Sequence, residues 1–150
     1  MRGAAPDVSV RTACAADAAV LAQLSTQLGY PADTAAILRR LARIEAENIG
    51  VVFVAQDGHG RVLGWTHVLS RLLLEQDEYA ELVGLVVDDG ARSAGIGALL
   101  LSAAEDWARS RNLGILRVRS NVVRERAHRF YLRAGYVERK RQVVFEKTLS

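Results

Sequence analysis

A glycine-rich turn between an apolar run and an apolar helical segment carries the clearest chemical pattern in this chain. The run ends in Asp88-Asp89-Gly90, and Gly95 and Gly97 precede the apolar segment that follows. The first turn of a helix has backbone N–H groups without intrahelical partners, and the helix dipole adds partial positive charge there. Glycine lets an anion approach this backbone closely, and Arg92 can add a charge-assisted contact. The pattern predicts an anion-binding turn at residues 92–98.

Three kinds of site use such a turn, and the spacing of their residues separates them. A P-loop needs Lys and then Ser or Thr after its last glycine, whereas Ala98 and Leu99 follow Gly97. A dinucleotide fingerprint needs Gly or Ala at position 100 and an acidic residue about twenty residues later. Position 100 is leucine, and residues 115–120 hold no acidic side chain. What remains is Arg-x-x-Gly-x-Gly at the end of a Val-Val strand.

This motif resembles the pyrophosphate-binding signature of the GCN5-related N-acetyltransferase (GNAT) superfamily, whose members bind acetyl-coenzyme A (acetyl-CoA). Residues 120–136, with the pair Phe130-Tyr131 and then Gly135-Tyr136, resemble the second coenzyme A segment of that superfamily. Residues 143–149 resemble its closing strand. The resemblance is detailed from Val51 onward and looser before it. It implies a mixed α/β (α+β) fold: a mostly antiparallel sheet with one splayed parallel strand pair, and helices on both faces.

The resemblance also assigns residues to coenzyme A. Three strand residues would bind the pantetheine arm through main-chain atoms, and the turn would hold the pyrophosphate: Leu85, Val86 and Val87, then Arg92, Ser93, Ala94, Gly95, Ile96, Gly97 and Ala98. Asn121 would orient coenzyme A or the substrate through its side-chain amide. Arg124 stands where many relatives place an asparagine that binds coenzyme A, so the sequence departs from the pattern there. Arg124 would instead contact phosphate or cap the following helix.

Two residues are candidates for proton transfer. A phenol with a pKa near 10 stays protonated at neutral pH, so Tyr131 can donate a proton to the departing coenzyme A thiolate, the role that the resemblance implies. An alkyl ammonium with a pKa near 10 must lose a proton before it attacks a carbonyl. Glu81 precedes Arg92 by eleven residues and matches the glutamate that acts as base, directly or through water, in the histone-acetylating branch.

The acceptor site of the superfamily involves the two N-terminal helices and the loop between them. Gln27, Tyr30, Glu75 and Glu78 are the candidates for acceptor binding, and the acidic residues among them would attract a cationic amine. These residues predict acetyl transfer to a primary amine by direct attack in a ternary complex. The acceptor stays open among small amines, aminoglycoside-like compounds and protein amines. The alternative is a non-catalytic coenzyme A-binding regulatory module.

Length, charge and composition limit the domain number, the partners and the location that can be expected. The chain has 150 residues, which predicts a single N-acetyltransferase domain over 1–150. Eleven basic residues lie between Arg109 and Arg141, against two acidic ones. Because aromatic interleaving and nucleic-acid motifs are absent, we assign this charge to the phosphates of coenzyme A and expect no nucleic-acid partner. One cysteine and no apolar run of about eighteen residues predict a cytoplasmic protein without a membrane partner. The resemblance also allows a homodimer, since relatives often form one, while the sequence itself leaves the oligomeric state open.

Hydrophobic periodicity predicts the elements that position these residues. Asp33 is the expected N-cap of the second helix, and Gly84 marks either a strand bulge or a close approach to a neighbour. Residues 71–77 are a polar connection with no assigned structure. No metal site is expected, because His59 and His67 lack partners at ligand spacing. The predicted strands are 8–12, 51–56, 62–69, 79–87, 115–119, 136–139 and 142–149, and the predicted helices are 17–28, a second beginning after Asp33, 95–110 and 124–134.

Overall fold

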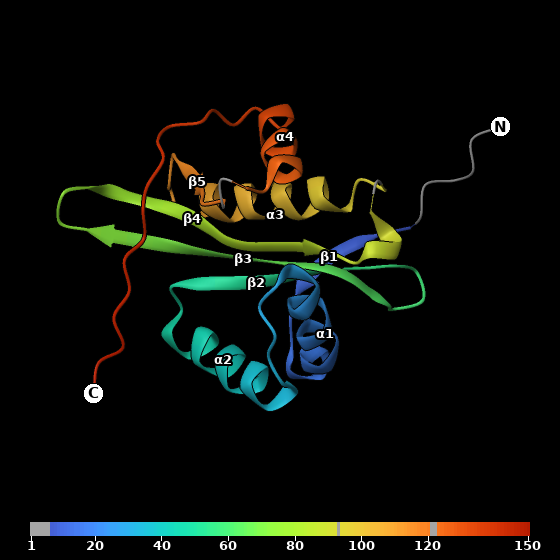
Figure 1. Cartoon of the computed structure of the whole chain (residues 1–150). Coiled ribbons are helices and arrows are strands. Elements are labelled where there is room, and N and C mark those ends of the chain that lie inside the picture. The colour runs from blue at the N-terminus through green and yellow to red at the C-terminus, as the bar shows by residue number, and fades with distance from the viewer. Residues whose placement is uncertain (1–6, 93, 121–122) are drawn as a thin grey trace. The chain divides into compact units, whose positions relative to one another are not determined.

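The central sheet has five strands in the order β1-β2-β3-β4-β5 (Figure 1). The computed structural model describes residues 7–92, 94–120 and 123–150, and the chain divides into two units, Met1–Arg119 and Ser120–Ser150. All neighbouring strands are antiparallel except β4 and β5, which are parallel because a helix crosses between them. The strands are β1 (Ser9–Thr12), β2 (Gly50–Gln56), β3 (Val62–Leu73), β4 (Gln76–Val87) and β5 (Leu116–Val118).

Helices of the N-terminal unit cover both faces of this sheet (Figure 1). On one face, α1 (Ala18–Leu28) and α2 (Thr34–Glu47) pack over a core that includes Leu21, Leu24 and Val86. On the other, α3 (Ile96–Ser110) buries Ile96 and Leu100 against Ala55 and Leu63. Short 3₁₀ turns, η1 (Ala15–Asp17) and η2 (Asp89–Ala91), precede α1 and α3. The predicted mixed α/β fold, with one parallel strand pair and helices on both faces, is confirmed.

Local sequence signals set the helix ends. The Asp33 carboxylate accepts a hydrogen bond from the Ala36 N–H at 2.7 Å, which satisfies one of the unpartnered amides of the first turn of α2. Gly29 ends α1 in the left-handed region, at φ 97°, where a side chain would be strained. These two signals separate α1 from α2 and leave a short connection around Tyr30.

A β-bulge interrupts β4 at Val83. His67 of β3 pairs with Gly84 and Val68 pairs with Leu82, so Val83 has no partner residue on β3. Gly84 is also where the sheet meets an indole ring, since a Cβ at this position would lie 2.8 Å from Cη2 and Cζ3 of Trp65. Both features expected of Gly84, a bulge and a close approach, therefore occur at this point of β4.

Replacing Gly84 with alanine should destabilise the fold by about 1–3 kcal/mol, the usual cost of overpacking. The new methyl group must displace the Trp65 ring, which packs against the core beneath α1 and α2. Urea unfolding measures this free energy. Gly114→Ala is the matched control, because nothing lies within 4 Å of a Cβ at position 114, and its effect should stay within about 0.5 kcal/mol. Equal midpoints for the two variants would contradict the clash.

The connection between β3 and β4 differs from the expectation. Residues 71–77 are mostly strand, because Arg71 pairs with Tyr79 and Leu73 with Gln76, so only a two-residue turn separates β3 from β4. The segment contains neither glycine nor proline, and cross-strand pairing extends both strands past the expected ends. Leu72 and Leu74 are exposed at the tip of this hairpin.

The C-terminal unit contains α4 (Glu125–Arg133), which confirms the last predicted helix. The two strands predicted over 136–139 and 142–149 are wrong, because the structure assigns neither helix nor strand to these residues. A strand exists only through hydrogen bonds to a neighbour, and alternation of residue type does not supply that neighbour. Val143, Val144 and Phe145 are accordingly exposed.

Candidate functional site

The N-terminus of α3 presents backbone amides without a protein cap among the described residues. Gly95 precedes the helix with φ 78°, no side chain caps the first turn, and that turn holds no acidic residue. The first intrahelical bond of this turn runs from Leu99 N–H to the Gly95 carbonyl at 3.2 Å. The amides of Ile96, Gly97 and Ala98 therefore face an end with partial positive charge. This geometry fits the anion-binding turn predicted from the sequence.

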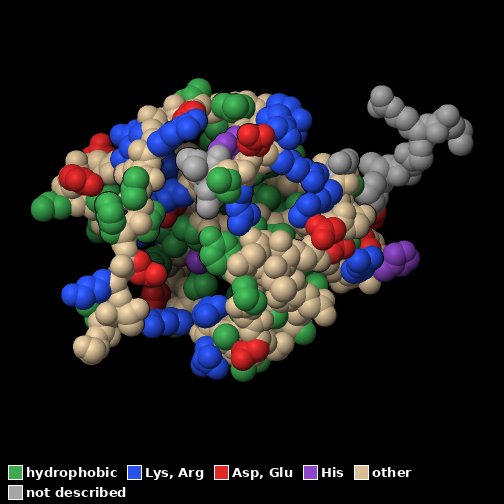
Figure 2. Space-filling model, viewed as in Figure 1, with side chains coloured by type: hydrophobic (Ala, Val, Ile, Leu, Met, Phe, Trp, Pro, Cys, Tyr) green, Lys and Arg blue, Asp and Glu red, His purple; other side chains and the backbone are tan. Residues whose placement is uncertain are grey.

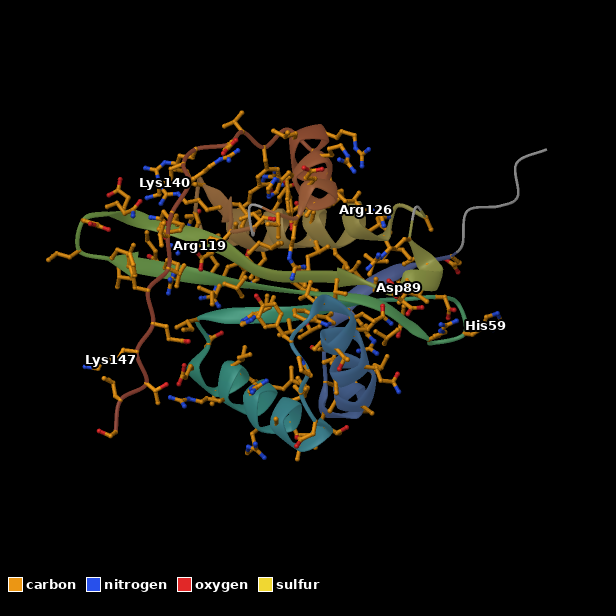
Figure 3. The ribbon with its side chains drawn as sticks, in the orientation of Figure 1. His59, Asp89, Arg119, Arg126, Lys140 and Lys147 are labelled. Carbon is orange, nitrogen blue, oxygen red and sulfur yellow. The ribbon has the colours of Figure 1, made fainter. Side chains whose placement is uncertain are left out.

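Ion pairs and hydrogen bonds fix the turn before α3. Arg92 pairs with Asp89 at 2.8 Å and keeps a side chain 40% exposed, so its guanidinium remains accessible beside the turn. Gln27 of α1 donates to the Asp88 carboxylate at 3.0 Å and accepts from the Asp89 N–H at 3.1 Å. Gln27, predicted to bind the acceptor, thus connects α1 to this turn. Asp89 lies beyond the C-terminal end of β4, while Arg119 lies toward the other end of the sheet (Figure 3).

The parallel pair β4 and β5 opens toward this turn. Their register runs from Ala80 opposite Leu116 to Leu82 opposite Val118, and β4 continues to Val87 after β5 has ended. From the bulge at Val83 onward, β4 has a strand neighbour on its β3 side alone among the described residues. The segment 85–87, predicted to bind pantetheine, lies on this one-sided stretch. Main-chain groups along an unpaired strand edge can bind an extended ligand.

Glu81 lies on β4 just before the bulge, buried to 3% exposure. Arg119 Nε lies 2.6 Å from Glu81 Oε1, and Arg71 Nε lies 3.4 Å from Oε2. The negative charge of Glu81 raises the pKa of the Arg119 guanidinium. Among the described residues, Oε1 accepts no well-aligned hydrogen bond, and its close contact is the ion pair with Arg119. A buried carboxylate oxygen without a well-aligned donor can accept a proton or a hydrogen bond from a further group.

The α1/α2 face of the sheet contains a pocket of about 260 Å³. Both helices form one wall, and Val52, Trp65, His67 and Val83 come from the sheet. Tyr30 lines it, as expected of an acceptor residue. The other predicted acceptor residues do not: Gln27 holds the α3 turn, Glu75 lies in the β3–β4 turn, and Glu78 accepts a hydrogen bond from Ser70.

His67 also lines this pocket, although no sequence motif assigns it there. Burial lowers the pKa of its imidazole, which favours the uncharged form at neutral pH. The alternation of side chains between the two faces of a strand could have indicated this position of His67. Residues two apart share a face, and Trp65 and His67 are such a pair. Among the described residues, no three His, Cys, Asp or Glu side chains gather as a metal site.

Tyr131 lies on α4 in an aromatic cluster of the C-terminal unit. Its ring centroid is 5.1 Å from that of Phe130 and 5.9 Å from that of Tyr136, both in edge-to-face arrangements. Burial raises the pKa of the Tyr131 phenol to about 12, and the positive charge of Arg124 opposes this shift. The phenol is therefore protonated at neutral pH. Arg124 directly precedes α4 and does not cap it through its side chain.

Lys and Arg side chains gather over α4 (Figure 2). Arg126, Arg129 and Arg133 lie on this helix, so the basic stretch noted in the sequence becomes a basic surface of the C-terminal unit. Asn121 and Ser93, both predicted to bind coenzyme A, fall outside the described residues. Within the part of the chain that the structure describes, no helix is long and apolar enough to cross a membrane.

Comparison with known proteins decides the family. The model of the acetyltransferase (GNAT) family matches residues 19–136. The chain belongs to the GNAT family. It is 31% identical over 146 residues to the aminoglycoside N(6')-acetyltransferase type 1 of Stenotrophomonas maltophilia, covering 95% of this chain and 94% of that protein. It is 32% identical over 97 residues to the aminoalkylphosphonate N-acetyltransferase of Salmonella typhimurium (strain LT2), covering 65% and 54%.

A solved GNAT structure shares the fold. The aminoglycoside N-acetyltransferase AAC(6')-Iy in complex with CoA superposes with a TM-score of 0.84 at 17% identity, covering 99% of this chain and 98% of that one. With relatives named as N-acetyltransferases across nearly its whole length, this GNAT protein is an enzyme of that class. Those relatives favour catalysis over the alternative of a binding module without turnover.

Proposed function

We propose that this GNAT enzyme transfers an acetyl group from acetyl-CoA directly to a primary amine while both are bound. The observation that supports this most is the uncapped, acid-free N-terminus of α3, beside a parallel strand pair that opens toward it. A diphosphate needs converging N–H donors and nearby positive charge, which the amides of 96–98 and Arg92 can supply.

The same elements suggest how the rest of acetyl-CoA would bind. The open edge of β4 at Leu85, Val86 and Val87 would take the pantetheine arm through main-chain groups. Glu81 precedes Val87 by six residues, which is about 20 Å of extended strand. An extended arm that begins at the α3 turn and follows β4 would therefore carry its thioester toward the part of β4 that holds Glu81.

The proposed reaction needs three proton transfers. The acceptor ammonium first loses a proton to the Glu81 carboxylate, directly or through a water molecule. The neutral amine nitrogen then attacks the thioester carbonyl carbon, and the carbon–sulfur bond breaks. Tyr131 donates its phenolic proton to the departing thiolate, which leaves as the free thiol. The acceptor nitrogen, positively charged after the attack, gives its remaining extra proton to the tyrosinate, which yields the neutral amide and restores the phenol. Among the described residues no nucleophile is assigned to form an acyl-enzyme, so we propose one direct transfer.

The relatives suggest two kinds of acceptor. One is named for aminoglycosides, which are polycationic, and the other for aminoalkylphosphonates, which carry an anionic group. Small amines and protein amines are further candidates for this enzyme. A cytoplasmic location and a homodimer stay predictions.

Thermal unfolding with and without acetyl-CoA tests the proposal. A ligand present at a hundredfold its Kd stabilises the folded state by about 2.7 kcal/mol. For a chain of this size that shift corresponds to a rise in Tm of roughly 5–10 °C. An unchanged Tm at millimolar acetyl-CoA would overturn the proposal.

The variant Gly97→Asp separates anion binding from folding. An aspartate in the first turn of α3 interacts favourably with the helix dipole, so the unliganded Tm should not fall. The same carboxylate repels a diphosphate, so the acetyl-CoA-induced rise in Tm should be lost. A full rise in this variant would show that acetyl-CoA binds away from the α3 turn.

A further inference from the structure

The pocket on the α1/α2 face carries information about the acceptor. Twelve residues line it, and eight of them have hydrocarbon or indole side chains. The four others are Ser25, Tyr30, Arg40 and His67. Among the residues that the structure describes, no aspartate or glutamate lines the pocket, which is unexpected for a site that binds several ammonium groups.

Of the described residues that line the pocket, Arg40 alone carries a permanent charge. It lies on α2 and is exposed, and its guanidinium makes no hydrogen bond or ion pair with the described residues. His67 is half-buried, and this burial lowers the pKa of its imidazole and favours the uncharged form at neutral pH. A second ammonium group on the acceptor would therefore meet apolar side chains and one positive charge. A carboxylate or another anionic group would instead find an available guanidinium.

The size of the pocket limits the acceptor as well. Its volume of about 260 Å³ lies just below the range of about 300–1,000 Å³ that is usual for small-molecule sites. This space suits a compact body, such as one ring or a short branched chain. A multi-ring sugar would leave most of its surface outside.

The two ends of the pocket have different chemistry. Val83, the bulge residue, lines the pocket on β4, two residues after Glu81. Arg40 lines it from α2, the opposite wall. An amine that enters with its nitrogen toward β4 would approach the proposed base, and its far end would approach Arg40.

We propose that the acceptor is a compact amine with an apolar body and an anionic group, bound in this pocket with the anionic group on Arg40. This assignment rests on the proposed function, because it takes the pocket as the acceptor site of the acetyl transfer. Arg40 is then a specificity-determining residue that selects acid-bearing amines over polycations.

Three acceptors of matched shape test the assignment: 4-(aminomethyl)benzoate, 4-(aminomethyl)benzamide and 4-(aminomethyl)benzylamine. They differ in one substituent, which is anionic, neutral or cationic. Release of free coenzyme A thiol gives kcat/KM for each, with kanamycin as a polycationic aminoglycoside. We expect kcat/KM for the benzoate to exceed that for the benzamide by about tenfold, the value of one charged hydrogen bond. The diamine and kanamycin should be poorer still.

The variant Arg40→Gln should lower kcat/KM for the benzoate by about tenfold, to within about twofold of the value for the benzamide. Arg39→Gln is the matched control, because Arg39 is the adjacent exposed arginine and does not line the pocket. A preference for kanamycin or the diamine, or an equal effect of Arg40→Gln on all acceptors, would overturn the assignment.

Binding without turnover separates this assignment from the proposed function. Trp65 lines the pocket, whereas Trp107 lies on α3 and stacks under Arg111 at 4.8 Å. In a Trp107→Phe protein, the fluorescence of Trp65 therefore reports occupancy of the pocket. Selective quenching by the benzoate that Arg40→Gln removes would support the assignment even if no amine were acetylated. No quenching by the benzoate would overturn it.

Discussion

Replacing Tyr131 with phenylalanine should lower kcat by about 10²–10⁴-fold, the usual contribution of a positioned general acid. The substitution removes one hydroxyl group and keeps the aromatic ring that packs edge-to-face on Phe130 and Tyr136. The phenol, with a pKa raised to about 12, holds its proton at any pH suitable for assay and can release it to a thiolate during the reaction. The KM for acetyl-CoA should stay within about twofold, because the lost interaction exists chiefly in the transition state.

Tyr136→Phe is the matched control for this prediction. It removes a phenol from the same aromatic cluster, and it should leave kcat within about threefold of the parent. Steady-state kinetics at saturating acetyl-CoA, with thermal unfolding of each variant, separates a catalytic defect from a folding defect. If Tyr131→Phe and Tyr136→Phe behave alike, the proton that the thiolate receives comes from another donor.

Elements whose signals are local could be predicted from the sequence. Asp33 predicts the start of α2, and its carboxylate caps that helix as expected. Gly84 indicates the bulge region of β4. Glycine weakens a regular strand, so its presence inside one often marks a bulge or a close contact. Such signals depend on one residue and its immediate backbone, so they are visible without tertiary structure.

Elements that depend on a distant partner could not be predicted in this way. The β3–β4 hairpin extends through residues 71–77 because cross-strand pairs form there. No glycine or proline in this segment indicates the position of the turn. Residues 142–149 alternate like a strand yet make no ladder in the structure. Alternation reports which residue types suit a pleated surface, and it says nothing of whether a neighbouring strand is present.

The same distinction between local signals and long-range contacts applies to the candidate site. The α3 turn is contiguous in sequence, and its motif coincides with the uncapped first turn of α3. The pocket draws on α1, α2, β2, β3 and β4, so its lining depends on packing between segments far apart in the chain. Arg40 and His67 carry no motif, and Gln27 holds a turn through contacts 61 residues away in sequence. Spacing finds residues that act within one segment and misses those that meet by folding.

Replacing Glu81 with glutamine should lower kcat/KM for the amine by about 10²–10⁴-fold, because the amide cannot accept a proton at neutral pH. The substitution conserves shape and removes the charge that Arg71 and Arg119 share. The fold should lose about 1 kcal/mol or less, since the side chains of these arginines are 42% and 57% exposed and water screens their repulsion. Kinetics and urea unfolding measure the two effects separately.

Arg119→Gln distinguishes a base from a positioning residue. If Glu81 serves only to hold the two guanidinium groups in place, then removing Arg119 should cost as much activity as removing the carboxylate. If Glu81 takes the proton, Arg119→Gln removes a neighbouring charge and leaves the acceptor oxygen, so activity should fall by about tenfold at most. Glu78→Gln, at an exposed carboxylate of the same strand, controls for loss of negative charge near the site. Equal losses in Glu81→Gln and Arg119→Gln would therefore reject Glu81 as the base and assign deprotonation of the amine to another group.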